Sequence, residues 1–71
     1  MDPLGIKHAL ERAGVSQADI ARECLVSGAT VHLVIFRGGI SAKVHGAIAK
    51  AIGVPKEDLW PEYYLKKAQN G

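Results

Sequence analysis

Residues that typically begin and end helices recur along the whole chain. Asp2 followed by Pro3 is typical of a helix start, because the carboxylate caps free backbone N–H groups and proline suits the first helical position. Further start signals, and the glycine or proline residues that end helices, divide the rest of the chain. The starts are Ser16, Ser27, Ser41 and Pro55, and the ends are Gly14, Gly38-Gly39, Gly53 and Pro61. The pattern predicts an all-α fold of five short helices.

Apolar residues recur at helical spacing between these signals and define the expected core. Between Ser41 and Gly53 they fall at i, i+3, i+4, i+7 and i+8, which places them on one face of a helix. The segment 31–36 is ambiguous, since its β-branched and aromatic residues would also suit a strand. A cap at Ser27 and the lack of an evident partner strand favour a helix there. The residues expected to face the core are Ile6, Leu10, Ala13, Ile20, Ala21, Cys24, Val31, Val34, Ile35, Val44, Ala47, Ile48, Ala51, Ile52, Leu59 and Trp60.

The short length and the single cysteine leave a hydrophobic core to hold the fold together. A chain of 71 residues buries only about 60% of its unfolded surface. Cys24 has no partner for an intrachain disulfide, and the histidines do not have the spacing of zinc ligands. No apolar run approaches the roughly 20 residues that span a bilayer, and no signal sequence is evident. We expect one soluble, cytoplasmic domain over residues 1–71, with a partly disordered tail at 62–71 and with no cofactor, metal or membrane partner.

The formal net charge of +2 conceals an uneven distribution. Residues 24–56 carry four Lys or Arg residues and no acidic residue, whereas the segments on either side are each slightly acidic. Chance in a short chain is one interpretation of this pattern, and a surface that attracts phosphate is the other. His32 lies inside the basic block, and His8 and His45 are expected on the surface.

Residues 17–36 have the pattern of a helix-turn-helix. Two short helices that meet at a steep angle need small residues where they touch and apolar residues around them. The small residues here are Ala21 and Cys24, and the apolar ones are Ile20, Val26, Val31 and Val34. Such a unit can place its second helix in the major groove of DNA. The pattern therefore predicts DNA binding through a recognition helix at about 28–36.

This segment resembles the lambda-repressor-like family of phage helix-turn-helix proteins, which includes the Cro and C repressors. More narrowly, residues 49–52 followed by Leu59-Trp60-Pro61 and Tyr63 are similar to the Ner and Nlp regulators of transposable phages and bacteria. The resemblance covers most of the chain and implies a compact five-helix domain that acts as a small transcriptional regulator, a repressor by occlusion. Leu25 departs from it, because the family usually has glycine with a positive φ in the turn. Either the turn has another shape or the leucine bears the strain.

The resemblance also implies which residues contact base edges: Ser27, Gly28, Ala29, His32 and Leu33. From their chemistry, Ala29 and Thr30 could meet thymine methyls, His32 could donate to guanine, and Leu33 could make apolar contact. Between Ser27 and Phe36 there is no Arg, Asn or Gln, the residues that read bases with two hydrogen bonds. We therefore expect modest base discrimination.

Much of the affinity should then come from phosphates. The resemblance implies a phosphate contact at Gln17, and the free N–H groups at the starts of the two helices would add to it. Arg37, Lys43 and Lys50 would supply positive charge. The expected partners are double-stranded DNA and, bound beside it on the DNA, a second copy of the chain. We expect no small-molecule effector, because the core helices leave no separate segment to sense one.

A protein-interaction module is the alternative function. Leu33 and Phe36 are expected on the outer side of the recognition helix, where exposed apolar side chains suit a partner. Together with Tyr63 and Tyr64 they would form the contact surface of a small inhibitor or antitoxin-like protein. The chain has no nucleophile motif and no glycine loop after a strand, so we expect it not to be an enzyme.

Overall fold

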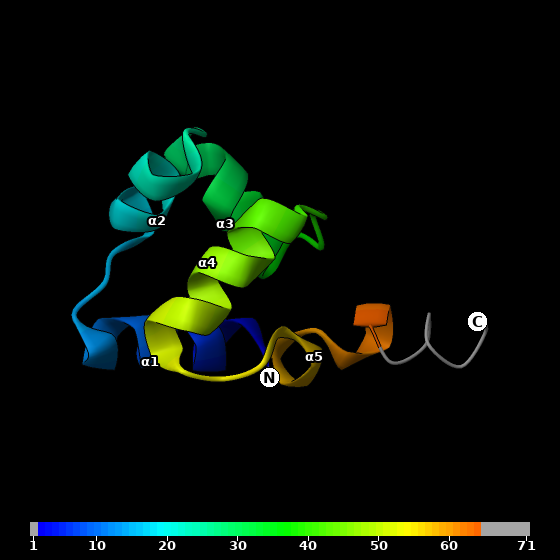
Figure 1. Ribbon diagram of the computed structural model, residues 1–71. Helices are drawn as coiled ribbons and strands as arrows, with labels where there is room; N and C mark the ends of the chain where they lie inside the picture. Colours follow the sequence, from blue (N-terminus) through cyan, green and yellow to red (C-terminus); the bar gives the residue numbers. More distant parts are fainter. Residues whose placement is uncertain (1, 65–71) are drawn as a thin grey trace.

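Five helices make up most of the structure, a computed structural model that describes residues 2–64 (Figure 1). They are α1 (Pro3–Ala13), α2 (Gln17–Cys24), α3 (Gly28–Phe36), α4 (Ala42–Ile52) and α5 (Lys56–Leu59). The described residues contain no strand, so the all-α prediction is confirmed, including the helix at 31–36. α2 and α3 lie together at one end of the molecule, α1 and α5 lie at the other, and α4 connects the two ends.

Side-chain caps begin four of these helices, as the sequence predicts. The Asp2 carboxylate accepts a first-turn N–H of α1 at 2.7 Å, and Ser41 Oγ accepts one of α4 at 3.3 Å. Ser16 and Ser27 cap α2 and α3 in the same way. Each cap satisfies an N–H group that a helix start leaves without a backbone partner.

Glycines end α1 and α4 in the left-handed conformation that this residue adopts without strain. Gly14 has φ 74° and Gly53 has φ 69°. The predicted end of a helix before Pro61 is confirmed, since α5 ends at Leu59, but a further helical turn that the pattern does not predict follows at residues 61–64. Proline fits the first position of that turn, since the N–H that it lacks would have no helical partner there.

Only the beginning of the predicted tail at 62–71 is described. Residues 62–64 belong to the last helical turn, and residues 65–71 lie outside the described part of the chain. Tyr63 and Tyr64 pack against the core, with their rings perpendicular and 4.8 Å apart.

One core joins the helices. Its buried apolar residues are Ile6, Leu10, Ile20, Ala21, Cys24, Val31, Val34, Ile35, Val44, Ile48, Leu59 and Trp60. The sequence predicts all of them. It also predicts Ala47, Ala51 and Ile52 in the core, and these three are only half-buried. The prediction is wrong for Ala13, which is exposed at the last turn of α1. Val15 packs against the core instead, after Gly14 has turned the chain.

His45 is buried, which contradicts its predicted place on the surface. Only 1% of the residue is exposed, and its ring stacks on Trp60 with 3.9 Å between centroids. Its Nδ1 lies 2.7 Å from the Tyr64 hydroxyl, and its buried Nε2 has no hydrogen-bond partner among residues 2–64. Burial lowers the pKa of this imidazole below its usual 6.5, and the positive charge of Lys56 lowers the pKa further. A neutral ring therefore suits the site.

Candidate nucleic-acid interface

α2, α3 and the turn between them form the helix-turn-helix predicted at 17–36 (Figure 1). α2 packs against both α3 and α4. The buried thiol of Cys24 supports this packing, since it donates to the Lys43 carbonyl oxygen at the start of α4 over 3.6 Å. α3 buries one side, formed by Val31, Val34 and Ile35. Most of its other residues remain exposed, as a helix that enters a groove requires.

The turn bends at Leu25, whose φ of 57° and ψ of 42° place it in the left-handed region. It is the one non-glycine residue with a positive φ within residues 2–64. A leucine there costs about 1–2 kcal/mol, because its Cβ crowds the following carbonyl oxygen. The side chain is 88% exposed, so core packing does not offset this cost. The turn therefore has the conformation that glycine would favour, and the leucine bears the strain.

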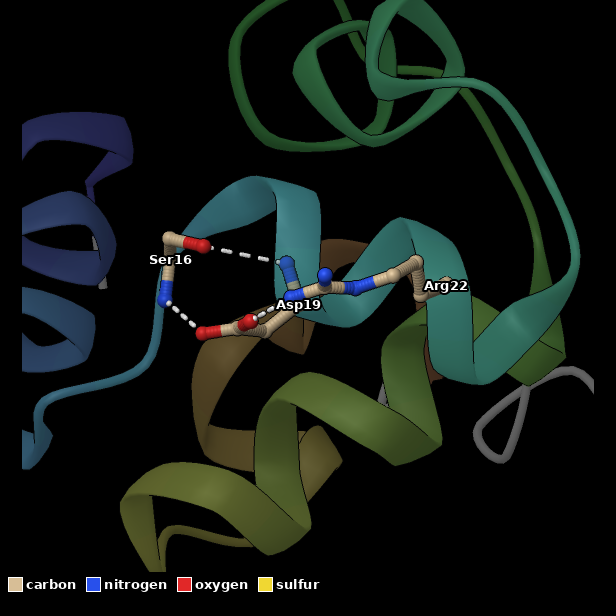
Figure 2. Close-up of polar contacts among 3 residues, drawn as sticks. All are labelled: Ser16, Asp19 and Arg22. Atoms are coloured by element: carbon tan, nitrogen blue, oxygen red, sulfur yellow. Dashed lines mark hydrogen bonds and ion pairs between the residues drawn. The ribbon is translucent and has the colours of Figure 1, made fainter.

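A capping box closes the start of α2 (Figure 2). Ser16 Oγ accepts the Asp19 N–H at 3.0 Å, and the Asp19 carboxylate accepts the Ser16 N–H at 2.9 Å. Asp19 also forms an ion pair with Arg22. The hydrogen bond from the Ser16 backbone, followed by the bond from Arg22, lowers the pKa of the Asp19 carboxyl. This carboxylate is therefore ionised at neutral pH.

The capping box limits the binding free energy that the predicted phosphate contact at Gln17 can contribute. Gln17 is half-buried directly after the cap, in a hollow that Ser16 and Lys7 also line. The Asp19 carboxylate already occupies one N–H of this helix end. Its negative charge opposes an approaching phosphate, and the ion pair with Arg22 balances that charge only in part. The contact at Gln17 stays a prediction.

The outer side of α3 carries the residues predicted to contact bases. Thr30 is half-buried, and the exposed ones are Ser27, Gly28, Ala29, His32 and Leu33. Ser27 and Thr30 bond to each other, since Ser27 Oγ accepts the Thr30 N–H at 3.2 Å and the two hydroxyls lie 3.1 Å apart. These bonds use part of their hydrogen-bonding capacity, and the proton of one of the two hydroxyls stays free to donate. The remaining polar side chain on this side is His32, whose ring lies 4.8 Å from that of Phe36.

Two exposed cations flank the loop from α3 to α4. Arg37 is the C-cap residue of α3, and Lys43 lies in the first turn of α4. Neither forms an ion pair within the described residues, where the one salt bridge joins Asp19 and Arg22. Lys50 is exposed as well, in the last turn of α4. Unpaired cations of this kind are free to contact phosphate.

Phe36 is less exposed than the sequence predicts. It is half-buried and packs against the core, as do Tyr63 and Tyr64. Leu33 remains 49% exposed. Of the four residues that would form a protein-interaction surface, Phe36, Tyr63 and Tyr64 therefore pack against the core. The Tyr64 hydroxyl also bonds to His45 of α4.

Residues 2–64 hold neither a metal site nor a membrane span. No cluster of His, Cys, Asp or Glu side chains there could hold a metal ion. No helix in this range is long and apolar enough to span a bilayer.

Comparison with known protein families agrees with this geometry. The chain matches the family model for winged helix-turn-helix DNA-binding domains over residues 1–71. No curated protein and no solved structure shows significant similarity to it. Within residues 2–64 the match rests on helices, since no strand that could form a wing is present there. Because the family model extends over the whole sequence and its defining unit is formed by α2 and α3, the chain belongs to the winged helix-turn-helix DNA-binding family.

Proposed function

We propose that this protein binds double-stranded DNA sequence-specifically and acts as a small transcriptional repressor, with α3 in the major groove. Membership of a DNA-binding family supports DNA as the ligand. The resemblance to lambda-repressor-like proteins, and among them to the Ner and Nlp regulators, supports the role of a phage-type regulator. Such a protein would occlude its site from other proteins, on the DNA of the nucleoid in the cytoplasm.

The observation that carries this proposal is the open surface at the start of α3. Gly28 and Ala29 are both small and exposed, and a Cβ added at Gly28 would meet nothing within 4 Å. The first turn of α3 can therefore approach DNA closely, and this is the end by which recognition helices contact bases.

The basic segment 24–56 is consistent with the same orientation, in which α3 lies in the major groove. Arg37 and Lys43 lie just beyond the end of α3 and have no acidic partner within the described residues. The DNA backbone passes on both sides of a helix in the major groove, so cations beside that helix neutralise phosphates. The absence of carboxylates from residues 24–56 removes the charges that would repel DNA from this surface.

We expect two copies to bind side by side on one operator. A two-fold dimer of helix-turn-helix proteins places its recognition helices about 34–36 Å apart, one turn of DNA. The operator would then be a palindrome whose half-sites are centred about 10 base pairs apart. Footprinting, combined with the stoichiometry of the complex in sedimentation, checks this expectation.

Salt titrations of DNA binding test the proposal. Each phosphate contact releases counterions, so its loss should flatten the slope of log K against log salt by about 0.9. Arg37→Ala and Lys43→Ala should each show this change, and the double variant should show about twice as much. Lys56→Ala is the matched control, since it removes one positive charge from α5, at the other end of the molecule from α3 (Figure 1).

The outcomes separate the proposal from simple charge attraction. If the wild-type protein does not bind duplex DNA even at low salt, the proposal is overturned. If Lys56→Ala flattens the slope as much as Arg37→Ala does, net charge alone drives binding and the proposed docking side is wrong. Circular dichroism of each variant verifies that the helices are intact.

A further inference from the structure

Ala29 and Leu33 form an exposed apolar strip on α3, at a place where a base-reading helix usually carries polar groups. Leu33 is 49% exposed although its neighbours Val34 and Ile35 are buried. Ala29, one helical turn earlier, is exposed as well, so the two side chains share one strip of surface. Leu33 is also the one large apolar side chain of α3 that is exposed to this degree.

One chemical group in the major groove matches such a strip. The C5 methyl of thymine is the largest apolar group on the base edges there, whereas their nitrogen and oxygen groups donate or accept hydrogen bonds. Placing one of those polar groups against leucine removes it from water without a partner, which is unfavourable. We propose that Leu33, with Ala29 beside it, is the main specificity-determining contact of this protein and reads thymine methyl groups in the operator. This inference rests on the proposed docking of α3 in the major groove.

The neighbouring residues let Leu33 reach a base. The residues before it on the strip are small, and the space at Gly28 is open. The hydroxyls of Ser27 and Thr30 are bonded to each other, so together they keep one free proton to donate to a base edge. The His32 ring is packed along α3 against Phe36. Leu33 is therefore the side chain on this strip with the most apolar surface left to bury.

Replacing thymine by uracil tests this contact, because it removes the methyl and leaves base pairing unchanged. The full chain would first select its sites from a random duplex library, and each thymine of a selected site would then be replaced singly by deoxyuridine. A methyl-sized group buried against apolar atoms changes an equilibrium by about fourfold. We expect one or two positions in each half-site at which deoxyuridine weakens binding by about that factor.

The Leu33→Ala variant connects the effect to this side chain. In that variant the ratio of thymine to uracil affinity at the sensitive positions should fall toward one, because the methyl has lost its partner. Alanine is the best helix former, so the exposed helix should keep its structure. Leu4→Ala is the matched control: it shortens a leucine that is 56% exposed on α1, and it should keep the fourfold ratio.

Each outcome decides between the two proposals. Insensitivity to deoxyuridine at every position would overturn thymine reading and leave DNA binding intact. A thymine-to-uracil ratio that Leu33→Ala leaves unchanged would do the same, because the sensitivity would then come from DNA shape or another residue. Failure of the wild type to select or bind any duplex would refute the proposed function itself.

Discussion

Leu25 is the position at which one substitution should raise the stability of this domain, because its backbone is strained and its side chain contributes little. The left-handed φ of 57° costs a leucine about 1–2 kcal/mol. Glycine relieves this strain but loses about 0.5–1 kcal/mol through the greater freedom of the unfolded chain. The leucine side chain is 88% exposed, so its removal uncovers little apolar surface in the core. For Leu25→Gly we therefore expect a net gain of about 0.5–1 kcal/mol.

Urea and thermal denaturation measure this gain. For a domain of this length, about 0.5–1 kcal/mol should raise Tm by about 2–8 °C. Leu25→Ala is the control that separates backbone from side chain. It also removes most of the leucine but keeps the Cβ that causes the strain, so its stability should stay within about 0.5 kcal/mol of the wild type.

Two results would refute the reasoning. A loss of about 1 kcal/mol or more in Leu25→Gly would mean that the side chain packs in the folded protein or that the turn does not have a positive φ. An equal gain in Leu25→Gly and Leu25→Ala would mean that removal of an exposed apolar side chain, rather than relief of the backbone, is the cause.

Two further predictions concern charged groups. Because the folded pKa of His45 lies below its usual 6.5, acid favours the unfolded chain: the free energy of unfolding should hold above pH 6.5 and fall as the pH drops through the folded pKa. Urea titrations across this range check it. Asp19→Ala should lower Tm more than Glu23→Ala does on the same helix, because it removes the capping-box bond to Ser16 as well as a surface charge. Provided that it stays folded, Asp19→Ala should also bind duplex DNA more tightly at low salt, since it removes a negative charge from the start of α2, and equal affinity would place that helix end away from phosphate.

The helix boundaries could be predicted because the signals that set them are local. A serine or aspartate bonds to an N–H three residues later, and a glycine turns the chain where it stands, so a short stretch of sequence contains the whole interaction. Pro61 marks both a predicted boundary and an unpredicted one, because α5 ends before it and a further helical turn begins at it. Proline suits both the end of one helix and the first position of the next, and its own neighbourhood does not distinguish them.

The burial of His45 could not be predicted from helical spacing. Spacing shows that α4 has an apolar face, but it does not fix how far that face is rotated toward the core. Residues after α5 decide this point, because Trp60 stacks on the imidazole and the Tyr64 hydroxyl bonds to it. The burial of Phe36 likewise depends on packing between helices rather than on α3 alone.

Some features of the candidate interface could be predicted from the sequence, and others depend on contacts in three dimensions. The exposure of Ala29, His32 and Leu33 follows from the three buried residues of α3, since a helix that buries one side exposes the other. Which polar groups remain free on that side does not follow, because the bonds between Ser27 and Thr30 appear only in three dimensions. Those bonds leave α3 with fewer free polar groups for a ligand than its composition suggests. Discrimination among bases should therefore depend on few side chains, and a single change at Leu33 should alter sequence preference more than it alters affinity for DNA in general.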